Sequence, residues 1–278
     1  MLIFLTDIGK NGEYMTDEMR MRCYGLVRGE RRARVDSLKN QEAKARSLAA
    51  GILLNVATGI YEGVISGAGL DIGQAKQDTD ICIRAYKAET DDVPYIVRHS
   101  LEFYLSLYDS KFDYELTSGV NGKPEFKQQG SPKIFFNLSH AGEFVVCAIG
   151  DKPVGIDIEG NRRISLKTAK RFFTEAEYQW VCGNMLTGSG AGKCQENYTQ
   201  LEDTGGQQKR FFRIWTMKEA YSKLTGVGIA SGVSQAEFLP KEDDKLRINF
   251  LHGACKTSGT RLFEYELEGY CIAVISYT

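Results

Sequence analysis

The sequence predicts a mixed α+β protein built from two packed units. Its 278 residues are 42% hydrophobic and 26% charged, an ordinary globular composition. A chain of this length divides readily into two units of about 120 to 150 residues. Each half also offers a long helical pattern together with short runs of strand-like alternation. We therefore expect two halves, residues 1–153 and 154–278, that each combine a helix with strands.

Apolar periodicity and turn residues define the elements of the first half. In chain order we predict a strand at 1–6, a helix at 37–57 that ends before Gly59, a Gly-rich loop at 59–79, a helix at 93–108, an extended segment at 111–116, and strands at 134–138 and 144–149. The turn at 150–153 then leads into a further strand at 154–158, which completes a hairpin.

The second half continues with helices and ends in strands. In chain order we predict a helix at 165–181 with Thr174 as a second cap, a long surface insertion within 183–208, a helix at 207–224 closed by Gly226, and strands at 246–250, 261–267 and 270–276. The insertion is rich in Gly, Ser, Thr and Gln and shows no period, which is typical of a surface segment without a core.

The bulk properties argue against several classes of protein. The net charge of −1 does not suit a protein that coats nucleic acid, and no run of about 18 apolar residues suggests a membrane span. The first ten residues are apolar but include Asp7 and no basic leader, so we expect no signal peptide. Seven scattered cysteines without a CxxC pair are expected to be reduced thiols of a cytoplasmic protein. Three distant histidines offer no zinc spacing.

Asp157 and Glu159 form the first chemically suggestive group. Alternation along the strand places both carboxylates on one face, with Val154, Ile156 and Ile158 on the other. Two carboxylates on one face can ligate a hard cation. Exposed acidic pairs are also common on antiparallel strands, so the pair by itself leaves a solvated surface as the alternative.

The second group lies on the helix at 207–224. Its core stripe is predicted to be Ile214, Met217, Tyr221 and Leu224, which places Lys218, Glu219, Ser222 and Lys223 on the opposite side and Trp215 at the edge. A carboxylate between two lysines suits a metal ligand flanked by cations for phosphate oxygens. An ordinary i,i+4 ion pair between Glu219 and Lys223 explains the same residues without a ligand.

The third group is a basic stretch between residues 28 and 46. Its cations are Arg28, Arg31, Arg32, Arg34, Lys39, Lys44 and Arg46. They form either a solvated helix face or a site for a phosphate-rich ligand. Nucleic acid is the weaker alternative, because the stretch is short and the rest of the chain cancels its charge.

Five short motifs in a fixed order resemble the phosphopantetheinyl transferases of the surfactin-synthetase-activating (Sfp) type. In chain order they are Gly122-Lys123-Pro124, Phe136-Asn137-Leu138-Ser139-His140, Gly155-Ile156-Asp157-Ile158-Glu159, the run 171–178 that reads RFFTEAEY, and the run 215–223 that reads WTMKEAYSK. They cover residues 120–223 densely. The insertion within 183–209 is longer and richer in Gly than this family leads us to expect, and it leaves the choice of carrier open.

The resemblance implies roles for individual residues. Asp157, Glu159 and Glu219 should hold Mg²⁺, with Mn²⁺ able to substitute, and Glu219 or a metal-bound water should help to deprotonate the attacking serine. The resemblance implies contacts with coenzyme A for two further sets. Lys123, Ser139, His140, Lys218 and Lys223 should meet the phosphates, whereas Arg31, Arg34, Arg46 and Ser47 should meet the nucleotide end.

The same resemblance implies a fold and an activity. The family fold has two similar α/β halves related by a pseudo-twofold axis, with coenzyme A in the cleft between them. The expected enzyme is a holo-[acyl-carrier-protein] synthase, that is, a 4'-phosphopantetheinyl transferase. It would move the phosphopantetheine group of coenzyme A to a serine of an acyl, peptidyl or polyketide carrier protein and release 3',5'-ADP. Such a monomeric cytoplasmic enzyme performs a post-translational modification in lipid or secondary-metabolite biosynthesis.

Two other functions remain compatible with the residues. A metal-dependent phosphohydrolase would use the same carboxylates with water as the nucleophile. A module that binds coenzyme A or a carrier without catalysis is the other alternative, although it would not need Asp157, Glu159, Glu219 and Lys223 together.

Overall fold

A computed structural model describes most of the 278-residue chain. The described residues are 1–66, 84–85, 94–127, 133–160, 162, 166–183, 206–228, 235–241, 244–251 and 259–278. The structure mixes helices and sheets, so the predicted α+β class is confirmed. Most of the insertion expected within 183–208 and most of the loop expected at 59–79 lie outside the described residues.

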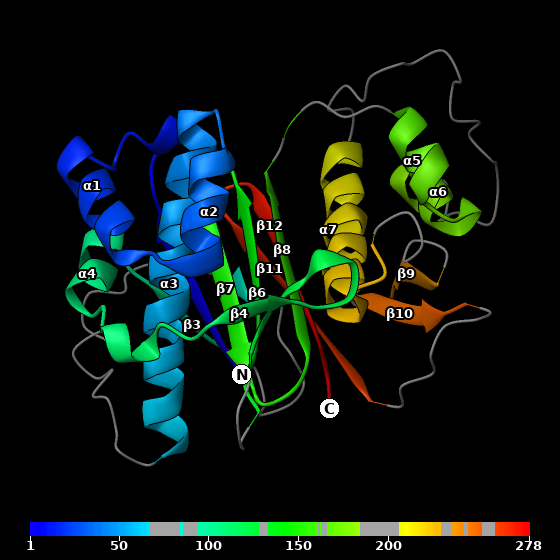
Figure 1. Ribbon diagram of the computed structural model, residues 1–278. Coiled ribbons are helices and arrows are strands. Elements are labelled where there is room, and N and C mark those ends of the chain that lie inside the picture. Colours follow the sequence, from blue (N-terminus) through cyan, green and yellow to red (C-terminus); the bar gives the residue numbers. More distant parts are fainter. Residues whose placement is uncertain are drawn as a thin grey trace.

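The first unit is a four-stranded sheet covered by helices on one face (Figure 1). The strand order is β3-β1-β7-β6, in which β1 is parallel to β3 and antiparallel to β7. The strands are β1 (Leu2–Asp7), β3 (Tyr95–Arg98), β6 (Phe135–Ala141) and β7 (Phe144–Gly150). The helices are α1 (Asp17–Leu26), α2 (Gly29–Ser37), α3 (Gln41–Ile65) and α4 (Leu101–Ser106).

The second unit repeats this plan around another sheet, with order β2-β11-β12-β8. Its strands are β2 (Arg84–Ala85), β8 (Val154–Gly160), β11 (Thr260–Leu267) and β12 (Tyr270–Tyr277). Its helices are α5 (Leu166–Phe172), α6 (Glu175–Val181) and α7 (Gln207–Thr225). Two small hairpins complete the description: β4 (Leu116–Ser118) with β5 (Pro124–Phe126), and β9 (Ala236–Pro240) with β10 (Leu246–Phe250).

The two units follow one topology. In each, a strand precedes a long helix, and a later hairpin returns so that its second strand pairs antiparallel with the first strand. In the first unit these elements are β1, α3 and the β6–β7 hairpin. In the second they are β8, α7 and the β11–β12 hairpin. This repeat is the internal similarity that the family resemblance implies. The division at residue 154 stays a prediction, because β2 from the first half of the chain pairs with β11.

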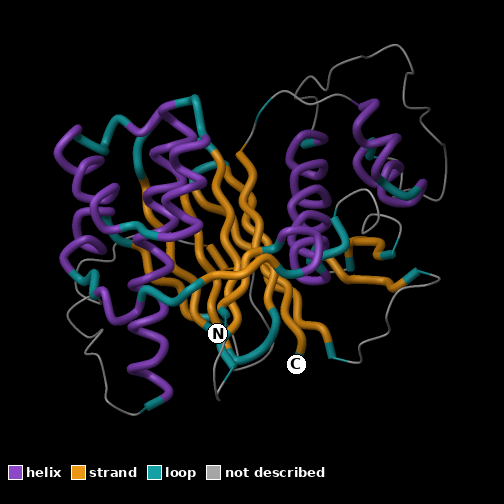
Figure 2. Tube along the Cα trace, in the orientation of Figure 1, coloured by secondary structure: helices purple, strands orange, loops and turns teal. Residues whose placement is uncertain are grey.

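Three clusters of buried side chains hold the layers together. One lies between α3 and the first sheet, and another lies between α7, the neighbouring helices and the second sheet. The third lies between the two sheets and includes Leu5, Val146, Ile156 and Val274. The strands therefore run through the middle of the molecule with helices on both outer sides (Figure 2). Burial of this apolar surface is the main favourable term in folding.

Two predicted elements in the first half need correction. The helix at 37–57 begins later, because Asn40 caps its first turn by accepting from the backbone N–H groups of Glu42 and Ala43. It also continues past Gly59 to Ile65, and the glycine lies inside the helix where the ring of Phe112 occupies the space that a side chain would need. The helix predicted at 93–108 is a strand at its start, β3, and only then a helix, α4.

The apolar helix α3 and the cysteines bear on two further expectations, the absence of a membrane span and the reduced state of the thiols. Helix α3 is long and apolar enough to cross a membrane, but 72% of its apolar window is buried inside the protein, as suits a core helix. Cys23, Cys147 and Cys271 are free thiols. Cys182 is disulfide-bonded, so the expectation of reduced cysteines is wrong at that position.

Candidate active site

The site begins with a close approach of α7 to strand β8. A Cβ atom added to Gly155 would lie 2.0 Å from the carbonyl oxygen of Ala220 and 2.6 Å from the backbone nitrogen of Leu224. Only glycine therefore lets the helix backbone rest on the strand. The predicted alternation along β8 is confirmed, because Val154, Ile156 and Ile158 pack between the sheets. Asp157 and Glu159 consequently face α7.

Asp157 is the centre of a hydrogen-bond network that joins three elements. Its Oδ1 atom accepts from Ser139 Oγ of β6 at 2.8 Å and from Lys223 Nζ of α7 at 2.7 Å. Lys223 also donates to Ser139 Oγ at 2.8 Å and to the backbone carbonyl of Ile156 at 3.1 Å. The sequence motifs that contain Ser139, Asp157 and Lys223 thus meet in space.

Asn137 explains why the first of these motifs reaches the second. Its side-chain oxygen accepts from the backbone N–H of Ile156 at 2.9 Å, two residues before Ser139 bonds Asp157 on the same face of β6. The Asn137 side chain thus joins β6 of the first sheet to the backbone of β8 in the second sheet. Sequence reasoning included Asn137 in a motif but gave it no role.

The second oxygen of Asp157 lacks a protein partner. Asp157 is 5% exposed, and among the described residues no hydrogen bond reaches its buried Oδ2 atom. A buried carboxylate oxygen without a donor is costly unless a ligand or ion satisfies it. The atom is therefore a candidate position for a cation.

Glu159 and Glu219 are perturbed by the same surroundings. Burial, and then the nearby Asp157 carboxylate, raise the pKa of Glu159 above its usual value and raise the pKa of Glu219 to about 7. Lys223 and Arg162 partly oppose these shifts. Trp215 Nε1 donates to Glu159 at 3.1 Å, and Arg162 lies 3.4 Å from the same carboxylate. Three acidic groups are thus held close enough to repel one another.

The donor set suits a hard cation, but the described side chains do not close around one. Oxygen ligands are what Mg²⁺ prefers, and the carboxylates supply them. Across the described ranges, however, no group of three His, Cys, Asp or Glu side chains lies close enough to hold a metal ion. Lys223 forms an ion pair with the Asp157 carboxylate, while Trp215 donates to the Glu159 carboxylate and Arg162 pairs with it. A cation would have to draw the carboxylates together, as expected for mutually repelling groups.

Lys218 does not join this group in the structure, and its phosphate contact stays a prediction. The side chain is 1% exposed and forms an ion pair with the fully buried Glu177 at 2.9 Å. It also donates to the backbone carbonyl of Ala236 at 2.9 Å. Helix α7 is packed on both sides, so residues 218 and 219, about 100° apart on the helix, point to different neighbours. Only Glu219 is directed to the Asp157 cluster.

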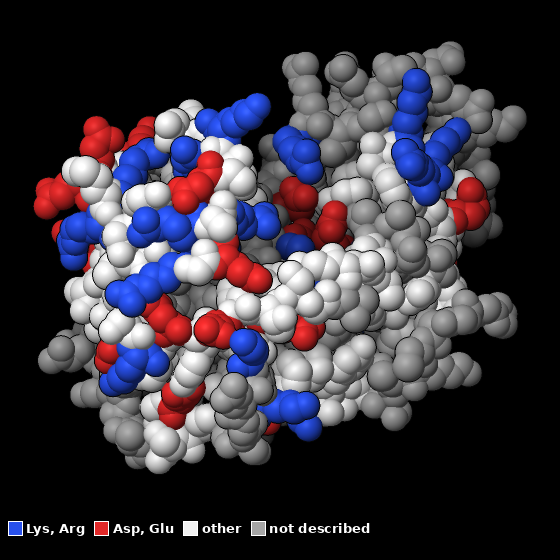
Figure 3. Space-filling view, viewed as in Figure 1, with Lys and Arg blue, Asp and Glu red and all other residues white. Residues whose placement is uncertain are grey.

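The first unit contributes basic groups opposite the carboxylates. Desolvation, and then the nearby cations Arg46, Lys223 and Arg34, lower the pKa of His140. Arg46 pairs with Glu42 and donates to the carbonyl of Gly142 at 3.0 Å. Figure 3 shows acidic side chains at the base of a hollow between the units, with basic side chains around it and gathered on the first unit. The charge distribution suits a ligand with several phosphates.

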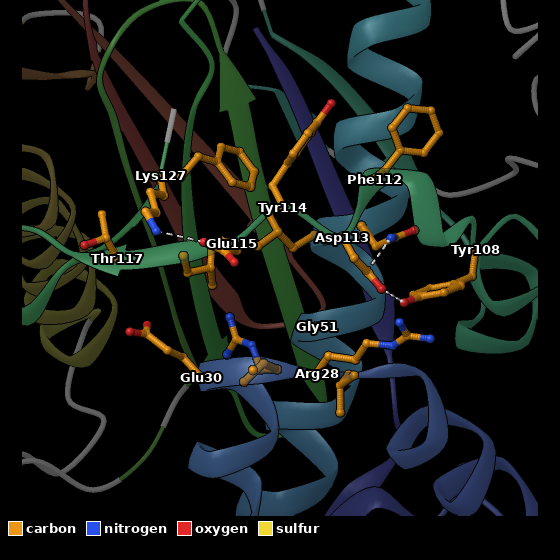
Figure 4. A pocket seen from close by; sticks show the side chains of 17 residues that line it. Arg28, Glu30, Gly51, Tyr108, Phe112, Asp113, Tyr114, Glu115, Thr117 and Lys127 are labelled. Carbon is orange, nitrogen blue, oxygen red and sulfur yellow. Dashed lines mark hydrogen bonds and ion pairs between the residues drawn. The ribbon is translucent and has the colours of Figure 1, made fainter. Parts of the chain in front are cut away.

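Two of the remaining basic candidates line a separate cavity of about 450 Å³ in the first unit. Its walls include Arg28, which precedes α2, Arg31 of α2, and the aromatic residues Tyr108, Phe112 and Tyr114 (Figure 4). Burial, and then Arg34, lower the pKa of Arg31 to about 10. No carboxylate of the Asp157 cluster lines this cavity. It therefore lies apart from the site at α7.

Ser47 and Lys123, two other residues predicted to contact coenzyme A, lie in surroundings of their own in the described structure. Ser47 is 5% exposed, and in the described part of the chain its buried hydroxyl has no hydrogen-bond partner. A ligand would reach it only after side chains moved. Lys123 is directed to the backbone carbonyls of Val154 and Leu224, each at 3.4 Å. No contact joins Lys123 to Asp157 among the described interactions.

Some residues of the site were not singled out from the sequence. Arg162 lies beside Glu159 and was missed because it belongs to none of the motifs or charge clusters that the sequence offered. Glu177 was expected only as part of a helix start, and it does close a capping box with Thr174. Its pairing with Lys218 across α6 and α7 has no pattern in the sequence.

Comparison with known proteins shows which proteins this chain is similar to. Residues 153–275 match the family model described as the 4'-phosphopantetheinyl transferase superfamily. The 4'-phosphopantetheinyl transferase psf-1 of Bacillus pumilus is 40% identical over 148 residues, which are 53% of this chain and 54% of that protein. The 4'-phosphopantetheinyl transferase Sfp of Bacillus subtilis is 30% identical over 167 residues, 59% of this chain and 63% of that protein.

These matches are partial. The chain spans about half the length of the curated relatives it matches. A solved holo-(acyl-carrier-protein) synthase of Bacillus anthracis, in complex with CoA (3',5'-ADP), covers 45% of this chain and 94% of its own at 21% identity and a TM-score of 0.31. That score is too low for the likeness to inform the site. The resemblance read from the motifs is confirmed by these relatives: residues 153–275 match the 4'-phosphopantetheinyl transferase superfamily, and Sfp-type enzymes are among the proteins that the chain is similar to.

Proposed function

We propose that this protein transfers the 4'-phosphopantetheine group of coenzyme A to a serine of an acyl, peptidyl or polyketide carrier protein and releases 3',5'-ADP. The observation that carries the proposal is the meeting of Ser139, Asp157 and Lys223 beside Glu159 and Glu219. These residues lie in or next to the segment that matches the superfamily. The proposal includes a monomeric cytoplasmic enzyme that acts without nucleic acid or membrane.

Mg²⁺ would be held by Asp157, Glu159 and Glu219. Its chemistry is to neutralise charge on the pyrophosphate as the bond to the leaving group stretches, and Mn²⁺ could replace it. The unsatisfied Oδ2 atom of Asp157 supports this assignment. Lys223 already lies on the Asp157 carboxylate, so its ammonium group is close to where the pyrophosphate would lie.

Glu219 is the residue we assign to the proton of the attacking serine. In the metal-free site its pKa is raised to about 7, and a bound cation would lower that pKa and favour the ionised carboxylate that can accept a proton. The serine oxygen then forms a bond to the β-phosphorus of coenzyme A, the pyrophosphate bond breaks, and 3',5'-ADP leaves with that bond's electron pair. The enzyme forms no covalent intermediate, so positioning and electrostatics supply the acceleration.

The basic groups of the first unit are proposed to bind the rest of the coenzyme. Arg34, Arg46 and Lys223 each lie near enough to His140 to lower its pKa. An anion there would favour the protonated imidazole and reverse the lowered pKa. Contacts of Arg31 and Ser47 with the nucleotide end of coenzyme A stay predictions. The Ser47 hydroxyl is buried, so neighbouring side chains would have to move before a ligand could reach it.

The test is the intact mass of an apo carrier protein after incubation with this protein, coenzyme A and Mg²⁺. A gain of about 340 Da, one phosphopantetheine group, is expected for the wild type and not for Glu219→Gln or with EDTA. Several carriers from fatty-acid, polyketide and peptide synthesis are compared, because the sequence does not rank them.

Two outcomes would replace this proposal with another. Coenzyme A cleaved while every carrier stays unmodified would indicate a metal-dependent phosphohydrolase. Coenzyme A and carriers both intact, with coenzyme A still bound in a direct binding measurement, would indicate a module without catalysis.

A further inference from the structure

The C-terminal end of α7 depends on groups outside the helix. The last four carbonyl groups of any helix have no partner within it. In α7 the carbonyl of Ser222 accepts from the N–H of Gly226 at 2.8 Å, and Gly226 itself adopts a positive φ of 72°. The carbonyls of Leu224 and Gly226 are satisfied by a different part of the chain.

That part is the turn between β4 and β5, residues 119–123, which belongs to the first half of the chain. Asn121 Nδ2 donates to the carbonyl of Gly226 at 2.6 Å. Lys123 Nζ lies 3.4 Å from the carbonyls of Leu224 and Val154. Figure 1 shows the β4 segment crossing in front of the strands from the side of α3 to the lower end of α7.

The turn is shaped for this contact. Asn121 and Gly122 both have positive φ, 52° and 78°, which curls the backbone so that the asparagine amide reaches α7. Desolvation lowers the pKa of Lys123, which the nearby Glu125 partly opposes. A buried lysine is costly, yet a cation beside the carbonyl end of a helix is favourable.

The contacts lie next to both elements that carry the site. Leu224 follows Lys223 directly, and Val154 is three residues, about 10 Å of strand, before Asp157. The turn thereby holds the last turn of α7 and the first residue of β8 at the same time. Lys223 joins the same two elements at its contact with Asp157.

We propose that the turn 119–123 is a positioning strap that holds the end of α7 against β8 and so keeps Lys223 on the Asp157 carboxylate. Asn121 and Lys123 are positioning residues in this assignment and act on catalysis through Lys223. The assignment rests on the proposed transferase function. It replaces a direct phosphate contact by Lys123 with a contact to backbone carbonyls.

Four variants test the strap: Asn121→Gly, Lys123→Met, both together, and Lys127→Met. Glycine keeps the positive φ of Asn121 and removes only its amide. Lys127 is the matched control, because it lies just after β5 on the same hairpin, pairs with Glu115 and contacts no residue of α7 among its described partners. Melting curves first establish that each variant is folded at the assay temperature.

The first measurement is steady-state transfer to an apo carrier. We expect each single variant to lower kcat about 3- to 10-fold with the KM for coenzyme A changed less than twofold, because the affected group acts on positioning. The kcat of the double variant should be at most about twofold lower than the kcat of the less active single variant, because both residues hold the same helix end. Lys127→Met should match the wild type.

The second measurement is amide hydrogen exchange at residues 224–226, which needs no activity. Exchange should accelerate at least about tenfold in Asn121→Gly and in Lys123→Met and stay unchanged in Lys127→Met. A wild type that modifies no carrier refutes the proposed function, whereas unchanged exchange in the two strap variants refutes the strap. A rise of tenfold or more in KM for coenzyme A in Lys123→Met, with kcat and exchange unchanged, would restore the phosphate contact.

Discussion

Helices α3 and α7 occupy the same place in the two units and are used differently. Each follows the first strand of its unit and packs on its sheet. From Ser47 to Tyr61 helix α3 is almost entirely buried, and its charged residues lie before or after that run. Helix α7 instead buries Arg213 and Lys218 and directs Glu219 and Lys223 to β8.

The difference follows from what surrounds each helix. The buried stretch of α3 packs among apolar side chains, so hydrophobic burial is its main contribution. Helix α7 lies between its sheet and the group formed by α6 and β9, where Glu264 and Glu177 pair with its buried cations. One topological position thus supports mainly stability in the first unit, whereas in the second it carries the residues that we propose for catalysis.

The substitution expected to have the largest effect on activity, and so to distinguish the role of α7 from that of α3, is at Glu219. Glu219→Gln removes the proposed base and one proposed metal ligand, so kcat/KM for carrier modification should fall by about 10² to 10⁴. The melting temperature without metal should stay the same or rise, because a carboxylate with a raised pKa is lost. Transfer assays and thermal melts check both parts. Near-normal activity in this variant would remove Glu219 from the mechanism.

The next effect concerns the buried pair on α7. Lys218→Met alone leaves Glu177 buried without its cation and should cost about 3 to 5 kcal/mol of unfolding free energy. Adding Glu177→Leu should recover most of that loss, because two apolar side chains replace the pair. Urea denaturation gives both values. The KM for coenzyme A of the double variant should match the wild type, and a large increase would reinstate Lys218 as a phosphate contact.

On α3 the corresponding change is Leu53→Ala. Leu53 is fully buried in the cluster against the first sheet. Its truncation should lower the unfolding free energy by about 2 to 5 kcal/mol through lost burial and the cavity left behind. Activity per folded molecule should stay within about twofold of the wild type, because no proposed ligand lies next to it. Loss of activity without loss of stability would contradict the division of roles between the helices.

The structure brings together residues that the sequence singled out, whereas several elements of the fold around them were not predicted. Asp157, Ser139, Glu219 and Lys223 are short-range features of motifs, and the alternation along β8 places its carboxylates on one face. Lys218 could not be placed, because helical periodicity alone does not tell that α7 is packed on two sides. Helices α1 and α2 were missed as elements, since their sequences are mostly polar and have weak apolar periodicity.

Longer-range contacts account for the other errors. The segment at 95–98 was predicted to be helical, but pairing with β1 makes it a strand. Gly59 was expected to end α3, whereas the ring of Phe112 packs over it inside a continuing helix. The role of Gly155 depends on the approach of Ala220 and Leu224 from a helix more than 60 residues away, which no local pattern reveals.

The smallest predicted effect is a difference in pH dependence caused by Glu219. Its pKa rises from 4.5 to about 7 on folding, so between these values the folded protein binds more protons than the unfolded chain. Stability without metal should therefore fall as pH rises through this window, and Glu219→Gln should lack that part of the slope. Urea denaturation of both proteins in EDTA across the window measures the difference. Mg²⁺ should reduce the slope of the wild type, because a bound cation favours the ionised carboxylate. Equal slopes for wild type and variant would show that Glu219 titrates normally and would weaken its assignment as the base.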